Sequence, residues 1–138
     1  MERVRQSIDL ARNALLTLEE ILTLDVSSDI IRDAAIQRFE YTFEAVWKAG
    51  KRFLLEVEGV DAASPKGTVR SFRELGLMTD AQASAALVMV NDRNLTVHTY
   101  NESVAMDIFS RVAEHTRLLR LWVDAMAQRE IEAGGQGG

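Results

Sequence analysis

The sequence contains no cysteine and a single proline among its 138 residues. Without cysteine the chain can form neither a disulfide nor a thiolate metal site, and no oxidising compartment is implied. The first segment, MERVRQSIDLARNALL, carries charges throughout and lacks the apolar block of a signal peptide or membrane span. With only two histidines, a zinc site is not expected either. We therefore expect a cytoplasmic protein with no metal, no cofactor and no membrane contact.

An excess of basic residues is also missing. The chain has 16 Lys and Arg against 21 Asp and Glu, which gives a net charge of −5. Because Lys and Arg supply most of the affinity for a phosphate backbone, this balance argues against indiscriminate binding to nucleic acid. Any role on RNA would need a local cluster of basic side chains. The apolar content of 47% and the charged content of 27% fit one soluble domain with a single core.

Apolar residues recur at helical spacing in five parts of the chain. This spacing predicts helices over about residues 2–24, 29–58, 64–76, 79–94 and from 99 onward. No β-type alternation is present, and the only proline, Pro65, stands at a predicted helix start. We therefore predict an all-α fold, a four- to five-helix up-and-down bundle that occupies residues 1–130. The Gly-rich end, residues 131–138, is expected to be a flexible tail.

Two capping boxes are predicted from short polar motifs. Thr79 and Gln82 precede the fourth helix at the required spacing, and Thr99 and Glu102 precede the fifth. In each box the Thr hydroxyl would accept a hydrogen bond from a backbone N–H of the first turn. The segment between these helices would then be a junction, where backbone groups lack helical partners and side chains can converge.

Two residues on the predicted apolar stripes are unusual for their positions. Gly50 costs about 1 kcal/mol in a helix relative to alanine, so its use is to let another helix approach closely. His115 lies on the stripe of the last helix. We interpret it as a core or interface histidine held by one hydrogen bond, because such a residue is more common than a lone histidine ligand.

The junction NDRNLTVHTYNE holds four side chains that can bind or move charge, namely Arg93, Asn94, His98 and Tyr100. Arg93 offers a planar guanidinium suited to a phosphate, and His98 can transfer a proton near neutral pH. Asn94 could orient a phosphate oxygen or the imidazole. These are the parts of a metal-independent ribonuclease, although one histidine cannot be both base and acid in the same step. A symmetric dimer that brought two His98 side chains together would supply both.

Other interpretations of these residues remain open. Side chains near a helix end often cap carbonyl groups, and a lone loop histidine is commonly a surface residue, so spacing alone favours no function. Glu44 on the second predicted helix could orient His98 or hold Arg93, or simply pair with Lys48 one turn away. A basic strip on the third predicted helix could guide RNA or a partner, or be a hydrated surface; it consists of Lys66, Arg70 and Arg73.

The segment RNLTVHTY matches the R-x4-H-x-Y motif of HEPN domains, which are small helical proteins encoded beside minimal nucleotidyltransferases. Three longer segments extend this likeness over most of the chain: AAIQRFEYTFEAVWKAGKRFL, SPKGTVRSFRELGL and MVNDRNLTVHTYNESVA. Together they resemble the branch known as nucleotidyltransferase substrate-binding proteins. The resemblance implies a HEPN-like bundle that forms a homodimer or a higher homo-oligomer.

The resemblance also implies roles for individual residues. Arg93 would be a phosphate ligand and His98 an acid or base of an endoribonuclease site at the dimer interface, with Asn94 as an accessory. A minimal nucleotidyltransferase encoded nearby would neutralise this toxin by transferring AMP to Tyr100. The negative charge and bulk of the nucleotide would then occupy the place of the RNA phosphate. The alternative is a non-catalytic subunit that presents substrate to the nucleotidyltransferase, so whether the protein is an enzyme stays open.

Overall fold

The structure is a computed structural model that describes residues 2–25 and 27–137. Within these residues there are no strands, and the five α-helices are α1 (Glu2–Ile21), α2 (Asp29–Phe53), α3 (Pro65–Glu74), α4 (Asp80–Leu95) and α5 (Glu102–Gly137). A π-helical turn, η1 (Leu54–Glu58), follows α2, and a 3-10 turn, η2 (Thr96–His98), follows α4. This content confirms the predicted all-α class.

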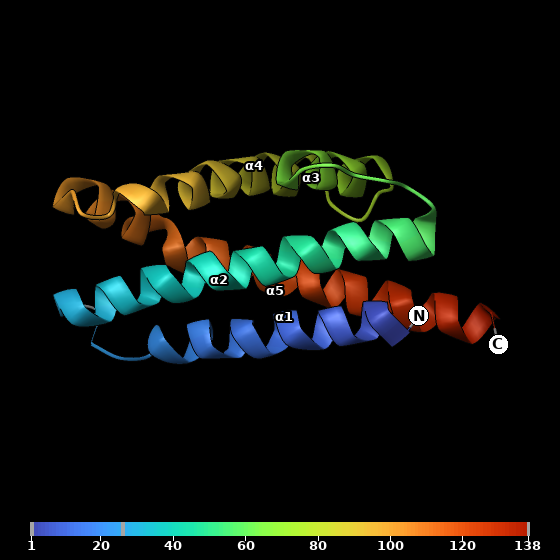
Figure 1. Ribbon diagram of the computed structural model, residues 1–138, viewed down its shortest axis with the longest axis horizontal. Helices are drawn as coiled ribbons and strands as arrows, with labels where there is room; N and C mark the ends of the chain where they lie inside the picture. Colours follow the sequence, from blue (N-terminus) through green and yellow to red (C-terminus); the bar gives the residue numbers. More distant parts are fainter. Residues whose placement is uncertain (1, 26, 138) are drawn as a thin grey trace.

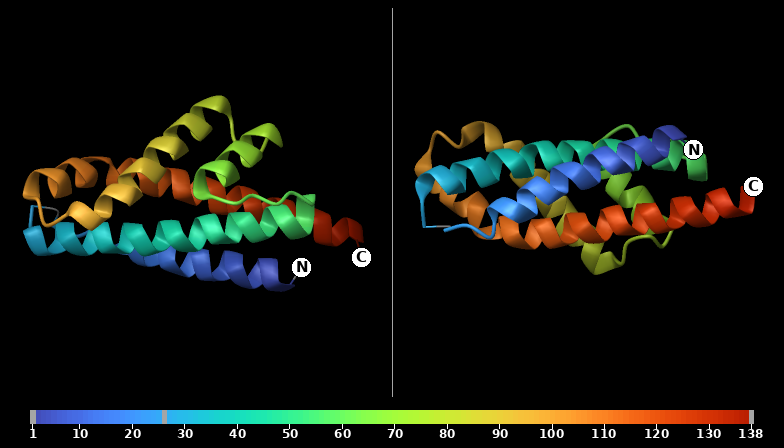
Figure 2. Two further views of the ribbon diagram at one scale, coloured as in Figure 1. Left: turned by 45° about the horizontal axis from the view of Figure 1, so that its top comes forward. Right: turned by 90° about the horizontal axis from the view of Figure 1, so that it is seen from below.

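Three long helices form the body of the bundle. α1, α2 and α5 pack against one another along their lengths, and α1 runs antiparallel to the other two (Figure 1). The α3–α4 hairpin packs on this body through contacts of α3 with α2 and of α4 with α5. Figure 2 shows that the end of α3 and the start of α4 project from the body, while the end of α4 meets the start of α5 at one end of the bundle. No helix in the described residues is both long and apolar enough to cross a bilayer.

The predicted apolar stripes form the core. In α5 the residues of the predicted stripe are all buried: Ala105, Ile108, Val112, His115, Leu119, Trp122 and Met126. Gly50 of α2 lies where three elements meet, and a Cβ built there would lie 3.1 Å from Thr68 Cγ2, 3.2 Å from Trp122 Cζ2 and 3.3 Å from Phe72 Cε2. These distances leave no comfortable room for a methyl group, so the predicted close approach of helices at Gly50 is confirmed.

The first predicted capping box is confirmed and the second is wrong. The Thr79 hydroxyl accepts from Gln82 N at 3.1 Å, and the Gln82 side chain accepts from Thr79 N at 2.9 Å. At α5, however, the Asn101 side chain accepts from the backbone N–H groups of Ser103 and Val104, at 3.0 and 3.4 Å. Thr99 instead donates to the carbonyl of Thr96, because η2 places its hydroxyl beside that turn.

The last two helices end later than predicted. α4 continues to Leu95, just past its predicted end, so both Arg93 and Asn94 lie in its last turn. α5 continues to Gly137, although the sequence predicts a tail without helical structure after residue 130. A glycine costs only about 1 kcal/mol relative to alanine, which weakens a helix without ending it when no other structure competes. The flexibility of residues 131–138 stays a prediction, and residue 138 lies outside the described part.

Candidate functional site

The motif residues lie where α4 ends and α5 begins. Arg93 and Asn94 belong to the last turn of α4, and His98 ends the 3-10 turn η2. The Thr96 hydroxyl donates to the Arg93 carbonyl at 2.6 Å, which ties the end of α4 to this turn. Tyr100 follows in the short connection before Asn101 caps α5. Local capping and one 3-10 turn therefore set the path of the whole motif.

Arg93 reaches across to α2. Its Nη2 donates to the carboxylate of Glu44, its Nη1 donates to Asn94 Oδ1 at 3.3 Å, and its guanidinium carbon lies 5.7 Å from the centroid of the Phe43 ring. The Arg93 and Glu44 side chains are 29% and 32% exposed, so solvent still reaches this ion pair. A hollow of about 340 Å³ beside the pair is lined by Gln37, Glu40, Tyr41, Glu44 and Arg93. A phosphate could approach Arg93 from this hollow.

Neighbouring side chains stabilise the ionised form of Glu44. Partial burial works to raise its pKa, but the adjacent Trp47 and Lys48 side chains and the charge of Arg93 leave the pKa of Glu44 below its ordinary value. Lys48 Nζ lies 3.2 Å from Glu44 Oε1, one turn along α2. Glu44 therefore contacts Arg93 and Lys48, two of the three partners suggested for it, but not His98. It offsets part of the positive charge that Arg93 would offer to a phosphate.

His98 and Tyr100 form a second, more exposed pair. The Tyr100 hydroxyl lies 3.4 Å from His98 Nδ1, and the two rings meet edge-on with centroids 5.9 Å apart. Tyr100 is 85% exposed. In the part of the chain that the structure describes, the imidazole has no other hydrogen-bond partner, so its Nε2 is available to a substrate. Which of the two groups donates in this contact depends on the tautomer of the imidazole.

The structure does not join these two pairs into one pocket within a single chain. Across residues 2–25 and 27–137, no hydrogen bond or ion pair links Arg93, Asn94 or Glu44 to His98 or Tyr100. The hollow beside Arg93 is not lined by His98 either. Both pairs nevertheless lie on neighbouring turns at the same end of the bundle. A shared site would need a substrate, or another chain, to bridge them.

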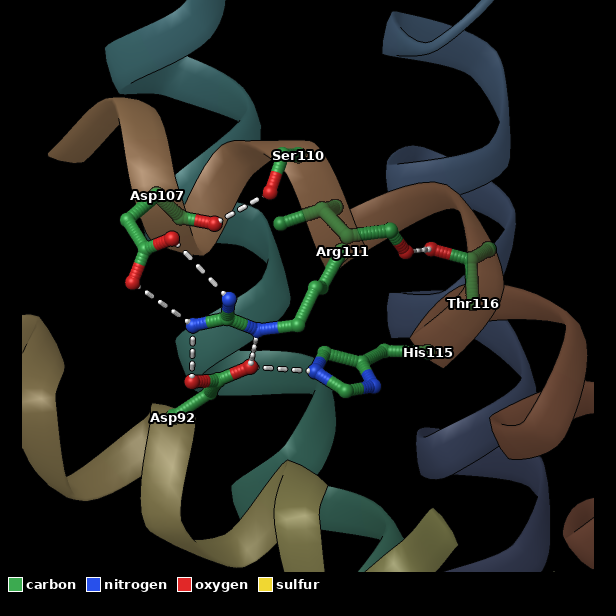
Figure 3. Close-up of polar contacts among 7 residues, drawn as sticks. Asp92, Asp107, Ser110, Arg111, His115 and Thr116 are labelled. Carbon is green, nitrogen blue, oxygen red and sulfur yellow. Dashed lines mark hydrogen bonds and ion pairs between the residues drawn. The ribbon is translucent and has the colours of Figure 1, made fainter.

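A buried polar cluster beside the motif was missed by sequence reasoning (Figure 3). Asp92 of α4 has a side chain only 4% exposed, and it accepts two hydrogen bonds of 2.7 Å from Arg111 of α5. His115 Nε2 lies 2.6 Å from the same carboxylate. Arg111 also donates to Asp107, at 3.1 and 3.2 Å. His115 is thus a core histidine held by one hydrogen bond, as predicted.

The charges of this cluster stabilise one another. Burial works to raise the pKa of Asp92, but hydrogen bonds from Arg111 and His115 outweigh it and leave that pKa below its ordinary value. The two carboxylates of Asp92 and Asp107 raise the pKa of Arg111. The only sequence signal for the cluster is the four-residue spacing of Asp107, Arg111 and His115 on one face of a helix. Their partner Asp92 is not indicated by any local pattern.

The basic residues predicted on the third helix do not form a connected site. Lys66, Arg70 and Arg73 lie along α3 and make no ion pair within the described residues. The two tryptophans have structural roles, since Trp122 is buried in the core and Trp47 is partly buried and packs against it. Among the residues that the structure describes, no three His, Asp or Glu side chains gather where they could hold a metal ion.

Comparisons with known proteins place the chain among helical relatives. A family model described as "Nucleotidyltransferase substrate binding protein like" matches residues 6–129. A Haemophilus influenzae protein named probable ribonuclease HepT is 29% identical over 96 residues, which are 64% of this chain and 64% of that protein. The match therefore spans less than two thirds of that relative's length.

Two solved structures share the fold. A Thermus thermophilus protein is 52% identical with a TM-score of 0.80, and the match covers 84% of this chain and 98% of that one. A Haemophilus influenzae protein, whose structure is described as revealing the fold of a substrate binding domain of a nucleotidyltransferase, is 20% identical with a TM-score of 0.73. The latter match covers 87% of this chain and 98% of that one, and it supports the bundle fold alone.

Proposed function

Because this chain belongs to the family of nucleotidyltransferase substrate binding protein like proteins, we propose that it pairs with a minimal nucleotidyltransferase and is an endoribonuclease that this partner switches off. Arg93 and His98 form the cleavage site, Asn94 and Glu44 are accessory residues that contact Arg93, and Tyr100 receives the modification. The name of the HepT relative, probable ribonuclease, supports this choice. Assembly as a homodimer, or a higher homo-oligomer, brings together the motif ends of neighbouring chains.

The cleavage needs a base, an acid and a cation, and no metal. His98 takes the proton of a ribose 2′-hydroxyl, whose oxygen attacks the adjacent phosphorus. Arg93 stabilises the negative charge that develops on the phosphorane. The 5′-oxygen of the next nucleotide leaves and takes a proton from His98 of a second chain, which gives a cyclic phosphate and a free 5′-hydroxyl. Each step uses only groups that the motif supplies.

The observation that carries the proposal is the placement of Tyr100. Its hydroxyl is open to solvent and lies 3.4 Å from His98 Nδ1. In the switching step, Tyr100 Oη attacks the α-phosphorus of ATP, pyrophosphate leaves, and His98 is placed to accept the phenolic proton. The AMP group then adds negative charge and bulk beside His98, where an RNA phosphate would otherwise bind. Modification of Tyr100 therefore blocks cleavage.

The test combines RNA cleavage with mass spectrometry. Purified protein should cleave RNA in the presence of EDTA, and His98→Ala and Arg93→Ala should abolish cleavage while circular dichroism stays unchanged. After co-production with the nucleotidyltransferase, the protein should carry an AMP-sized addition that Tyr100→Phe lacks. Tyr100→Phe should still cleave RNA, and its activity should resist the nucleotidyltransferase. Full cleavage by His98→Ala would remove the catalytic assignment.

A non-catalytic substrate-binding subunit is the second candidate. The ion pair of Arg93 with Glu44 favours it, because a guanidinium that already holds a carboxylate is a weaker ligand for RNA phosphate. The net charge of −5 acts in the same direction. This function predicts a stable complex with the nucleotidyltransferase that survives the double change Arg93→Ala, His98→Ala. It also predicts that the unaltered protein leaves RNA intact at every concentration tested.

A further inference from the structure

Asp92 is a locally unfavourable residue for the position that it occupies. It lies in the last turns of α4, where the helix dipole disfavours negative charge, and aspartate is a poor helix former. Its side chain is 4% exposed, so its charge has also been removed from water. Local structure alone would favour alanine or leucine here. A residue that opposes local preference in this way marks a tertiary or functional requirement.

Stability alone does not explain the cluster well. A buried ion pair is often no more stabilising than apolar side chains of similar volume, because desolvation offsets the attraction between the charges. What a bidentate Arg–carboxylate pair adds is geometry, since two parallel N–H···O bonds fix direction as well as distance. Here Arg111 Nε and Nη2 bind the two oxygens of Asp92, and His115 binds one of them from the side. The last turns of α4 are therefore held in one orientation on α5.

That orientation also determines where Arg93 points. Successive residues of an α-helix are about 100° apart around its axis, so a carboxylate fixed on α5 at position 92 sets the direction of position 93. Arg93 accordingly extends to α2, where Glu44 accepts from it and the Phe43 ring lies 5.7 Å from its guanidinium. A rotation of this turn would carry Arg93 away from both partners. The two adjacent residues thus act as one unit.

A second set of contacts connects the cluster to Arg93 through the core. The His115 ring stacks on Phe39 with centroids 5.4 Å apart, and the Phe39 centroid lies 6.4 Å from that of Phe43, the ring beneath Arg93. All three aromatic side chains are buried. Because buried side chains are closely packed, a displacement of His115 would also displace Phe39 and Phe43.

We propose that Asp92 is a positioning residue. Together with Arg111 and His115 (Figure 3), it fixes the last turn of α4 so that Arg93 points to Glu44 and the phosphate site. The inference rests on the proposed function insofar as Arg93 is the phosphate ligand. Its structural part, the dependence of the Arg93–Glu44 contact on the cluster, can be measured without any RNA. The two parts can therefore fail separately.

The test uses Asp92→Asn and Arg111→Lys. Lysine keeps the charge of Arg111 but loses its fork, so a role that needs only charge would be preserved. Arg120→Lys is the matched control, because Arg120 makes a similar two-bond contact to Glu19, at 3.1 and 2.5 Å, between α5 and α1. Circular dichroism and urea unfolding check that each variant folds. If Asp92→Asn does not fold, Arg111→Lys still tests the inference, because the Arg111 side chain is only half-buried and a change there is better tolerated.

The first readout is the pKa of Glu44, which is measured from the pH dependence of the NMR signal of its side-chain carboxyl. The Arg93 charge helps to hold this pKa low, so it should rise toward its ordinary value in Arg111→Lys and Asp92→Asn and stay unchanged in Arg120→Lys. The second readout is RNA cleavage. Because Arg93 binds the RNA phosphate and also stabilises the charge that develops in the transition state, kcat/KM should fall on the order of 10- to 100-fold.

Each outcome has one meaning. A Glu44 pKa that rises in both cluster variants but not in the control supports the inference, whether or not the protein cuts RNA. If the unaltered protein cuts no RNA while this shift is seen, the proposed function fails and the positioning role stands. An unchanged Glu44 pKa overturns the positioning role, and an equal loss of kcat/KM in Arg111→Lys and Arg120→Lys overturns the link between this role and cleavage.

Discussion

Replacing Glu44 by glutamine should strengthen RNA binding, because it frees Arg93 from a competing carboxylate. The two side chains are 29% and 32% exposed, so their ion pair is neither fully solvated nor buried. We assign it about 1 kcal/mol, the upper end for exposed pairs, since solvent screens much of the attraction. If RNA phosphate must displace Glu44, removing that competition lowers the Kd about fivefold. Glutamine keeps the shape of the side chain and still accepts a hydrogen bond from Arg93.

The assay is fluorescence anisotropy of a labelled single-stranded RNA, in a His98→Ala background so that the RNA stays intact. Glu40→Gln is the matched control. Glu40 lies one turn away on α2, lines the same hollow and makes no ion pair in the described residues. Both changes remove one negative charge from the same surface, so only the difference between them reports the contact with Arg93. The gain in Glu44→Gln should shrink at high salt, because added salt screens phosphate contacts.

Two results would refute this reasoning. Equal gains in Glu44→Gln and Glu40→Gln would mean that net charge matters and the Arg93 contact does not. Weaker RNA binding in Glu44→Gln would mean that Glu44 holds Arg93 in the orientation that phosphate needs. A further change, Lys48→Met in the Glu44→Gln background, separates a contribution from the freed lysine, whose Nζ lies 3.2 Å from Glu44.

Three further predictions concern stability and are tested by urea unfolding. Gly50→Ala should lower the free energy of unfolding by about 1 kcal/mol, because crowding against Trp122 and Phe72 exceeds the gain in helix propensity. The control Gly134→Ala on α5 should not destabilise the protein, because a Cβ built there has no side-chain atom closer than 4.0 Å. Asn101→Ala should cost about 1 kcal/mol through loss of the α5 cap, and Thr99→Ala clearly less. Burial works to raise the pKa of Asp92, but its hydrogen bonds outweigh this effect and lower the pKa. The ionised cluster therefore contributes stability that is fully present above pH ~4, and this stability is lost as the pH falls through the lowered pKa. The stability difference between the unaltered protein and Asp92→Asn should therefore be smaller at acidic pH than at neutral pH.

The ends of helices show how far local pattern can be trusted in this chain. Thr79 and Gln82 form the predicted capping box because both partners are three residues apart and nothing else competes for them. Thr99 and Glu102 have the same spacing, yet Asn101 caps α5. There, η2 engages the Thr99 hydroxyl, and Glu102 lies 3.5 Å from Arg32 of α2. Two of these contacts are local in sequence, and only the one between Glu102 and Arg32 depends on the tertiary fold.

The candidate site could be predicted only in part, because some of its contacts depend on the tertiary fold. Arg93, Asn94, His98 and Tyr100 are close in sequence, so the amino-acid order alone places them in one segment. Their grouping into two pairs does not follow from that order, because it depends on the 3-10 turn and on the rotation of α4. Asp92 was overlooked altogether, since aspartate near a helix end usually faces solvent and nothing local marks it as buried.

The sequence by itself determined the helices, the stripes that bury the core and the close approach at Gly50, because each follows from side-chain spacing along one helix and from the size of one residue. Only the tertiary structure decided that Glu44 holds Arg93, 49 positions away, and that Arg111 and His115 hold Asp92. Contacts between helices depend on how each one is rotated against its neighbours, and that rotation is a property of the packed core as a whole.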